Sequence, residues 1–119
     1  MKRRDTGILG EKLAKDFLKK RGYRIWETNY RCLEGEIDII AKHKDSLVFI
    51  EVRTKRSQEF GSPEESITPG KMARLRAVAA HYQQTHLPQL WRIDVVAVEL
   101  DQKGKPSRIE LIENAVTEE

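Results

Sequence analysis

The stretch GEIDIIAKHKDSLVFIEVRTK, residues 35–55, decides the fold, because it contains two apolar runs joined by a short polar turn. This pattern predicts a hairpin of two strands, over residues 36–42 and 47–54. An acid interrupts each apolar run, Asp38 in the first strand and Glu51 in the second. The presence of these two acids within apolar strands therefore needs a chemical explanation.

The short turn HKDS predicts the register of the two strands. If Lys42 lies opposite Leu47, Ile39 lies opposite Ile50, and a slip of one residue would place acids opposite core-facing side chains. The predicted apolar face consists of Ile37, Ile39, Ala41, Val48, Ile50 and Val52. On the other face the predicted pairs are Asp38 with Glu51, Glu36 with Arg53, and Ile40 with Phe49, the last suggesting a partly covered cleft.

Two carboxylates placed directly opposite each other repel, so we expect either a raised pKa or a cation between them. Mg²⁺ prefers oxygen ligands and is commonly held by one or two carboxylates together with a substrate phosphate. The sequence therefore predicts a Mg²⁺ (or Mn²⁺) site at Asp38 and Glu51. The alternative is an acidic face that merely solvates the sheet, but the nearby cation Arg53 on the same face favours a site.

The remaining elements follow from periodicity and from helix start and stop signals. Apolar residues at helical spacing predict a first helix from Asp5 to Arg21, with Asp5 or Thr6 as N-cap and Gly22 at the stop position. The other predicted elements are a strand at 23–27 followed by a polar connection or strand continuation, a loop at 56–66, a helix from the Thr68 cap and Pro69 to about His86 that Pro88 ends, a central strand at 91–100, and an edge strand at 108–113.

This order of elements predicts the fold class. Residues 47–100 form a strand, helix, strand unit, which should be a parallel crossover, whereas the opening hairpin is antiparallel. We therefore expect an α/β (α+β) fold with a central mixed sheet flanked by helices. The length of 119 residues suits one hydrophobic core, so a single domain over residues 1–119 is expected.

Composition limits the function classes. Hydrophobic residues make up 39% and charged residues 34%, which predicts a globular chain rather than a disordered one. We expect no membrane span and no secretory signal, so the default location is cytoplasmic. The net charge of +3 permits a nucleic-acid partner without requiring one.

Several single residues have two readings. Cys32 is the one cysteine of the chain, so an internal disulfide is excluded. With no second cysteine there is no zinc-site spacing, and we expect Cys32 to be a small half-buried side chain. Asp94 interrupts the predicted central strand, where a structural acid paired with an arginine and a role in the cleft fit equally well. Lys71 and Arg74 lie one turn apart at the start of the second helix, where phosphate binding and plain solvation have comparable weight.

At these residues the chain resembles a known family. Asp38 followed by EVR, which contains Glu51 and Arg53, is similar to the PD-(D/E)xK signature of restriction-endonuclease-like nucleases, including archaeal Holliday junction resolvases. The closer resemblance is to the YraN-like uncharacterised protein family, over about residues 7–98. It rests on GILGEKLAKDFLKKRGYRI, NYRCLEGEIDIIA, LVFIEVRTK, FGSPEESI, Lys71 and RIDVVAV.

The resemblance implies an αβββαβ core, metal binding by Asp38 and Glu51, and a first-helix residue, Glu11, that reaches the same cleft. For Glu11 a solvated first-turn acid is the alternative. The chain departs from the signature at Arg53, which occupies the lysine position. Arginine stays protonated and cannot act as a general base, but it can orient a phosphate, and Lys55 on the same strand face could substitute in part.

Three functions follow as hypotheses. The first is a metal-dependent endonuclease that hydrolyses phosphodiester bonds in DNA rather than RNA, including branched or damaged DNA, with Lys55, Lys71 and Arg74 contacting the nucleic acid. A junction substrate would favour a homodimer, since paired cuts need two active sites. The alternatives are an inactive nucleic-acid-binding module and a protein-interaction domain on the same fold.

Overall fold

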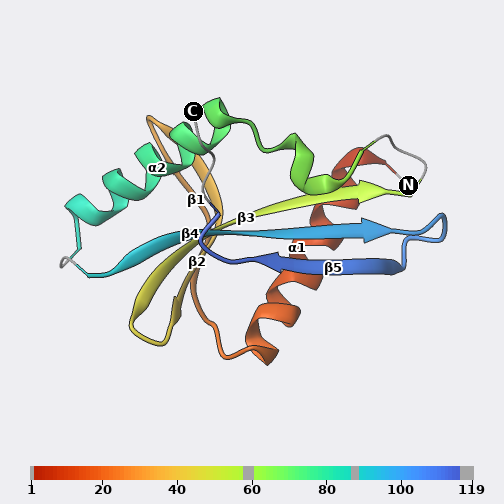
Figure 1. Ribbon diagram of the computed structural model, residues 1–119, viewed down its shortest axis with the longest axis horizontal. Coiled ribbons are helices and arrows are strands. Elements are labelled where there is room, and N and C mark those ends of the chain that lie inside the picture. Colours follow the sequence, from red (N-terminus) through yellow and green to blue (C-terminus); the bar gives the residue numbers. More distant parts are fainter. Residues whose placement is uncertain (1, 58–60, 87–88, 116–119) are drawn as a thin grey trace.

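The sheet is mixed and has the strand order β1-β2-β3-β4-β5 in the computed structural model, which describes residues 2–57, 61–86 and 89–115. Within these ranges two α-helices flank the sheet (Figure 1). The elements are α1 (Arg3–Lys20), β1 (Arg24–Cys32), β2 (Gly35–His43), β3 (Ser46–Arg56), a short 3₁₀ helix η1 (Pro63–Ser66), α2 (Pro69–Gln84), β4 (Trp91–Leu100) and β5 (Pro106–Ile112). The predicted fold class and element order are confirmed.

Strand β4 lies between β3, the middle strand of the sheet, and the edge strand β5. It pairs in parallel with β3, to which α2 connects it, and antiparallel with β5. The predicted parallel crossover is therefore confirmed. The run from Ile93 to Val98 is buried throughout, as expected for a strand that is covered on both faces.

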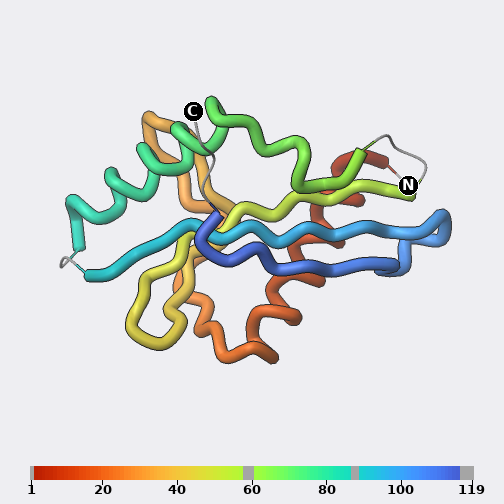
Figure 2. The backbone as a smooth tube through the Cα atoms, in the orientation of Figure 1, coloured from red at the N-terminus to blue at the C-terminus, as the bar shows by residue number. Residues whose placement is uncertain are grey.

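Each helix covers one face of the sheet with its own apolar cluster (Figures 1 and 2). The α1 side is packed by Ala14, Leu18, Tyr23, Ile39, Ala41, Val48, Ile50, Val96, Val98 and Leu100. The α2 side is packed by Ile37, Ile40, Leu47, Phe49, Met72, Leu75, Val78, Ala79, Tyr82 and Ile93. The hairpin of β2 and β3 therefore contributes apolar side chains to both layers.

The helix ends differ in part from the predictions. The N-cap of α1 is Lys2, so neither Asp5 nor Thr6 caps it, and the Thr6 hydroxyl inside the helix donates to the Lys2 carbonyl at 3.2 Å. Thr68 caps α2 as predicted, because its hydroxyl accepts from the Lys71 N–H at 3.2 Å. Helix α2 ends at Gln84, and Pro88 lies outside the described residues.

The hairpin register is confirmed over its paired part, in which Ile39 lies opposite Ile50, Ile40 opposite Phe49, Ala41 opposite Val48 and Lys42 opposite Leu47. The prediction of one continuous apolar face is wrong. Ile37 packs on the α2 side, whereas Val52 packs on the α1 side. Ile40 and Phe49 are fully buried beneath α2 and do not border a cleft.

The break in alternation occurs at Asp38 and has a local cause. The Val52 N–H donates to the Asp38 carboxylate at 2.7 Å, so a side chain takes part in the pairing of β2 with β3. On the other side of β2, Thr28 and Tyr30 of β1 pair with Ile39 and Ile37, the two neighbours of Asp38. Asn29, which lies between Thr28 and Tyr30, has a φ of 55°. Figure 1 shows the β1 and β2 hairpin turning away from the direction of the other three strands.

Of the helices in the described ranges, neither combines the length and the apolar character that a membrane crossing requires.

Candidate metal centre

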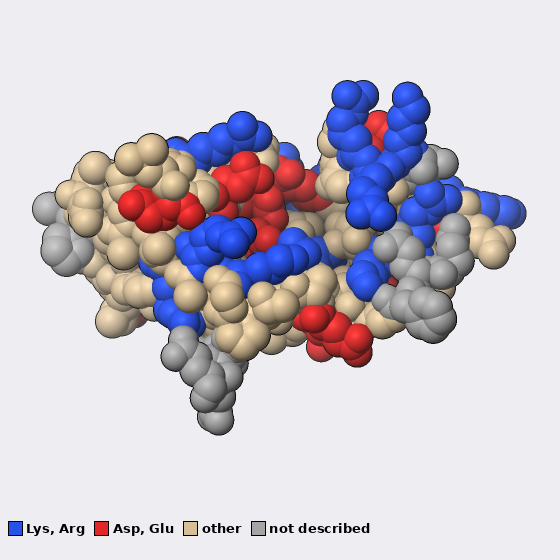
Figure 3. Space-filling view, turned by 90° about the horizontal axis from the view of Figure 1, so that it is seen from above, with Lys and Arg blue, Asp and Glu red and all other residues tan. Residues whose placement is uncertain are grey.

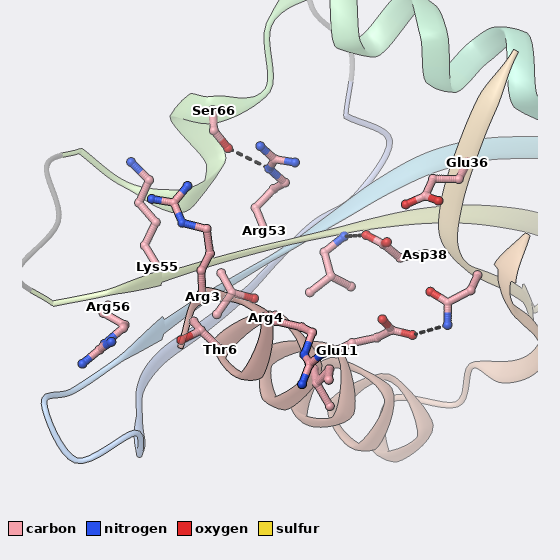
Figure 4. Close-up of a pocket in the computed structure, with 15 residues that line it drawn as sticks. Arg3, Arg4, Thr6, Glu11, Glu36, Asp38, Arg53, Lys55, Arg56 and Ser66 are labelled. Carbon is pink, nitrogen blue, oxygen red and sulfur yellow. Dashed lines mark hydrogen bonds between the residues drawn. The ribbon is translucent and has the colours of Figure 1, made fainter. Parts of the chain in front are cut away.

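A cleft of about 850 Å³ opens where β2 turns away from β3. Residues of α1, β1, β2, β3 and η1 line it, and those of interest are Glu11, Asn29, Glu36, Asp38, Arg53, Lys55 and Ser66. Figure 4 shows Glu11, Glu36 and Asp38 toward one end and Arg3, Lys55 and Arg56 toward the other. Seen from above the view of Figure 1, the molecule has an acidic patch with Lys and Arg groups around it (Figure 3).

Glu11 reaches this cleft because α1 packs closely on β3. At Gly10 an added Cβ would overlap the Thr54 hydroxyl, so only glycine allows this approach. The next residue, Glu11, then borders the cleft, and its carboxylate accepts from the Asn29 amide at 3.2 Å. Burial, and then the negative charge of Asp38, raise the pKa of Glu11.

Asp38 and Glu51 lie side by side and their carboxyl groups share a hydrogen bond. Such a bond needs one proton between the two groups. The Glu51 side chain is 16% exposed, and burial together with the charge of Asp38 raises the pKa of Glu51 to about 8. Burial also raises the pKa of Asp38. The carboxyl groups of Asp38 and Glu51 therefore share a proton, and a metal cation could take the place of that proton.

Arg53 is held beside this pair by two hydrogen bonds. One guanidinium nitrogen, Nη1, donates to Glu51 Oε2 at 3.2 Å, and Nε donates to the Ser66 hydroxyl at 2.7 Å. Ser66 in turn donates to the Pro63 carbonyl at 2.6 Å. The orientation of Arg53 therefore depends on η1 as well as on β3.

The η1 segment is itself anchored to the edge strand. Both carboxylate oxygens of Glu64 accept from Arg108 of β5, at 3.1 and 2.6 Å. These hydrogen bonds lower the pKa of Glu64. Two residues of the segment SPEES therefore have separate tasks, since Glu64 fixes the segment and Ser66 fixes Arg53.

The predicted basic residues divide between two places. Lys55 lines the cleft, whereas Lys71 and Arg74 lie on α2 outside its lining. Arg3, Arg4 and Arg56 line the cleft and were not predicted to do so. The sequence showed a basic start of the chain, but only the packing of α1 on β3 brings it to this cleft. Asn29 and Ser66 lie in the segments NYRCLEGEIDIIA and FGSPEESI that carry the family resemblance, but neither belongs to a periodic pattern that singles it out.

Asp94 lies outside this cleft and is fully buried in a different environment. Its carboxylate accepts from the Tyr23 hydroxyl at 2.8 Å, from Arg92 at 3.0 Å and from the Asn114 N–H at 2.8 Å. The structural reading of Asp94 is therefore the one that its contacts support.

Together these features define a small α/β domain with a half-buried carboxyl pair, of which Asp38 lines a cleft that basic side chains border. The model of the uncharacterised protein family UPF0102 matches residues 10–98. A UPF0102 protein of Dehalococcoides mccartyi is 51% identical over 119 residues, covering 98% of this chain and 97% of that protein. One of Caldicellulosiruptor bescii is 45% identical over 118 residues, covering 97% of this chain and 99% of that protein.

A further UPF0102 protein, from Moorella thermoacetica, is 47% identical over 117 residues and covers 97% of this chain and 98% of its own length. The chain belongs to the UPF0102 family, which confirms the resemblance to the YraN-like family. The family is described as uncharacterised, so the function has to be argued from the cleft.

Proposed function

We propose that this protein is a Mg²⁺- or Mn²⁺-dependent nuclease that hydrolyses phosphodiester bonds in DNA, including branched or damaged DNA. The observation that carries this proposal is the contact of Glu51 with Asp38, which lines a cleft that basic side chains border. The order αβββαβ and the placement of Asp38, Glu51 and Arg53 also support membership of the PD-(D/E)xK superfamily.

The residues present fit a hard divalent cation. Asp38 and Glu51 offer carboxylate oxygens, and the proton that they share marks a position where positive charge is favourable. Glu11, whose pKa responds to Asp38, would complete the acidic side of the cleft. When bound, such an ion polarises the scissile phosphodiester and lowers the pKa of a water molecule for attack.

The basic side chains have a separate role in this proposal. Arg53 would hold a phosphate oxygen and stabilise negative charge that develops on it, and it cannot remove a proton because it stays protonated. Lys55 and the arginines at the other end of the cleft would contact the sugar-phosphate backbone. Lys71 and Arg74 could reach only nucleic acid that extends beyond the cleft onto α2. Cutting both strands of a junction would need two copies of the chain.

The test is a cleavage assay on single-stranded, duplex, flap and four-way DNA with Mg²⁺ or Mn²⁺. Asp38→Asn and Glu51→Gln should each lower the rate at least about 100-fold, since metal-ion catalysis supplies several kcal/mol. Asp45→Asn is the matched control, because Asp45 lies exposed in the turn of the same hairpin. Cleavage that persists in both cleft variants would contradict the proposal.

One observation favours a second function on the same cleft. Arg53 stands where the signature has lysine and is engaged by Glu51 and Ser66, which suits phosphate binding without chemistry. A nucleic-acid-binding module would bind DNA with an affinity that falls steeply as salt is added, and would cleave with neither Mg²⁺ nor Mn²⁺. A gel-shift titration at several salt concentrations, run beside the cleavage assay, separates the two functions.

A further inference from the structure

A second group of metal-ligating side chains lies away from the cleft, where the tip of the β1 and β2 hairpin meets α2. Among the described residues, Cys32, Glu34 and His81 place a thiol sulfur, a carboxylate oxygen and a ring nitrogen within 4.8 Å of one another. None of the three residues lines the cleft of Asp38. We infer that these residues form a Zn²⁺ site with three protein ligands and one open position.

The distances suit a tetrahedral ion. With ordinary Zn–S, Zn–N and Zn–O bond lengths, neighbouring donor atoms lie roughly 3.4 to 3.6 Å apart. His81 Nδ1 already lies 3.1 Å from Glu34 Oε1. The His81 and Glu34 side chains are 37% and 41% exposed, so small side-chain rotations can close the site and an ion can enter from solvent. Cys32 is half-buried beside the apolar cluster under α2, which gives the site a fixed base.

The backbone explains why ligands far apart in the sequence come together. Cys32 ends β1 and pairs with Gly35, which begins β2, so Glu34 lies in the tight turn between them. Gly35 has a φ of 142°, and an added Cβ would lie 3.2 Å from the Arg74 side chain. The hairpin tip therefore rests directly on α2. Val78, which also faces Gly35, lies three residues before His81 on the same side of the helix.

The donor set separates this site from the carboxyl pair. A thiolate and an imidazole favour Zn²⁺ or Co²⁺, whereas carboxylates alone favour Mg²⁺ or Mn²⁺. The Cys32 thiol must lose its proton to solvent when the ion binds, because the thiolate is the ligand. The site would tie the hairpin that carries Asp38 to α2. It does not depend on the proposed nuclease activity.

The test uses Co²⁺ as a spectroscopic probe on the whole protein. The wild-type chain should take up one equivalent with a near-ultraviolet band from thiolate-to-cobalt charge transfer, and Zn²⁺ should abolish that band by displacement. Cys32→Ser should remove the band, and His81→Ala should weaken binding by more than about 100-fold, since even outer-shell changes cost 10- to 100-fold. His86→Ala, at a histidine just beyond the end of α2, should give the wild-type band.

Two results would overturn the inference. If the wild-type protein gives no charge-transfer band, His81 and Glu34 form only an ion pair. If His81→Ala titrates like His86→Ala, the cysteine binds cobalt without the helix. Circular dichroism of each variant confirms that it is folded, and calorimetric titration with Zn²⁺ provides an affinity that does not depend on colour.

Discussion

Asp38 and Asp94 both interrupt an apolar strand of the same sheet, but their surroundings differ. Asp94 is fully buried and its charge is balanced by Arg92, with further hydrogen bonds from Tyr23 and Asn114. Asp38 is half-buried at the edge of a cleft, accepts one backbone N–H and lies beside another acid, Glu51, to which Arg53 donates. A buried acid with balanced partners stabilises a fold, whereas two adjacent acids that share one arginine favour a bound cation.

The largest effect that tests this comparison is expected at Asp94. Asp94→Asn should lower the free energy of unfolding by about 3 kcal/mol, the lower end of the range for breaking a buried ion pair. The lower end applies because the Arg92 side chain keeps 18% exposure and can be partly hydrated. Urea unfolding at neutral pH measures this change. A loss below about 1 kcal/mol, typical of exposed pairs, would show that Asp94 is not structural.

The second prediction concerns the proton that Asp38 and Glu51 share. The folded pKa of Glu51 is about 8, above its ordinary value of 4.5, so the folded protein binds more protons between these values. The contribution of this proton to stability should therefore be fully present below pH 4.5 and be lost as the pH rises toward 8. From pH 5.5 to pH 8 in the absence of metal, the wild-type chain should lose roughly 2 kcal/mol more than Glu51→Gln, on the order of 1 kcal/mol per pH unit.

This loss is measured by urea unfolding in EDTA at a series of pH values. Asp45→Asn, which changes an exposed acid of the same hairpin, should follow the wild-type pH dependence. If the free energy of unfolding depends on pH in the same way for the wild type and Glu51→Gln, Asp38 and Glu51 share no proton.

The third prediction is a change in the free energy of unfolding opposite in sign to the one expected for Asp94→Asn. Asp38→Asn should raise the free energy of unfolding by about 1 kcal/mol at pH 8 in EDTA, because it removes one of two adjacent like charges. The asparagine carbonyl can still accept from the Val52 N–H, so the hydrogen bond at the strand pair is retained. Urea unfolding of Asp38→Asn and Asp94→Asn under the same conditions measures whether the two changes have opposite signs. A destabilisation of Asp38→Asn as large as that of Asp94→Asn would remove the distinction between the two sites.

The same comparison explains what could be predicted from the sequence. Apolar periodicity and turn signals were enough for the class, the element order and the register near the turn, because each depends on neighbouring residues. The break at Asp38 could not be predicted, since it depends on a side chain that bonds to the backbone of another strand. The closeness of Asp38 and Glu51 was inferred by extending the register one pair beyond Ile39 and Ile50, where the pairing of the two strands stops.

Contacts between distant segments left no such signal. The approach of α1 to β3 at Gly10, which brings Glu11 and the basic start of the chain to the cleft, is visible only in three dimensions. The cluster of Cys32, Glu34 and His81 joins a turn to a helix across the fold, and a search for zinc-site spacing overlooks it. The sequence also favoured neither a structural role nor a role in the cleft for Asp94, and its hydrogen-bond partners in the fold decide for the structural role.

The smallest expected effect concerns an acid and arginine pair at the surface, which completes the series. Glu64 and Arg108 have side chains that are 28% and 29% exposed and lie 2.6 Å apart. The folded pKa of Glu64 is lowered by Arg108, so its contribution to stability is present above the ordinary pKa of 4.5 and is lost in acid. Glu64→Gln should cost about 0.5 kcal/mol at pH 7, because solvent screens such a pair. Urea unfolding at pH 7 and at pH 3 measures this cost, and the difference from wild type should be smaller at pH 3. A cost near that of Asp94→Asn would mean that burial does not decide the strength of these pairs, and the contrast between Asp38 and Asp94 would then need another cause.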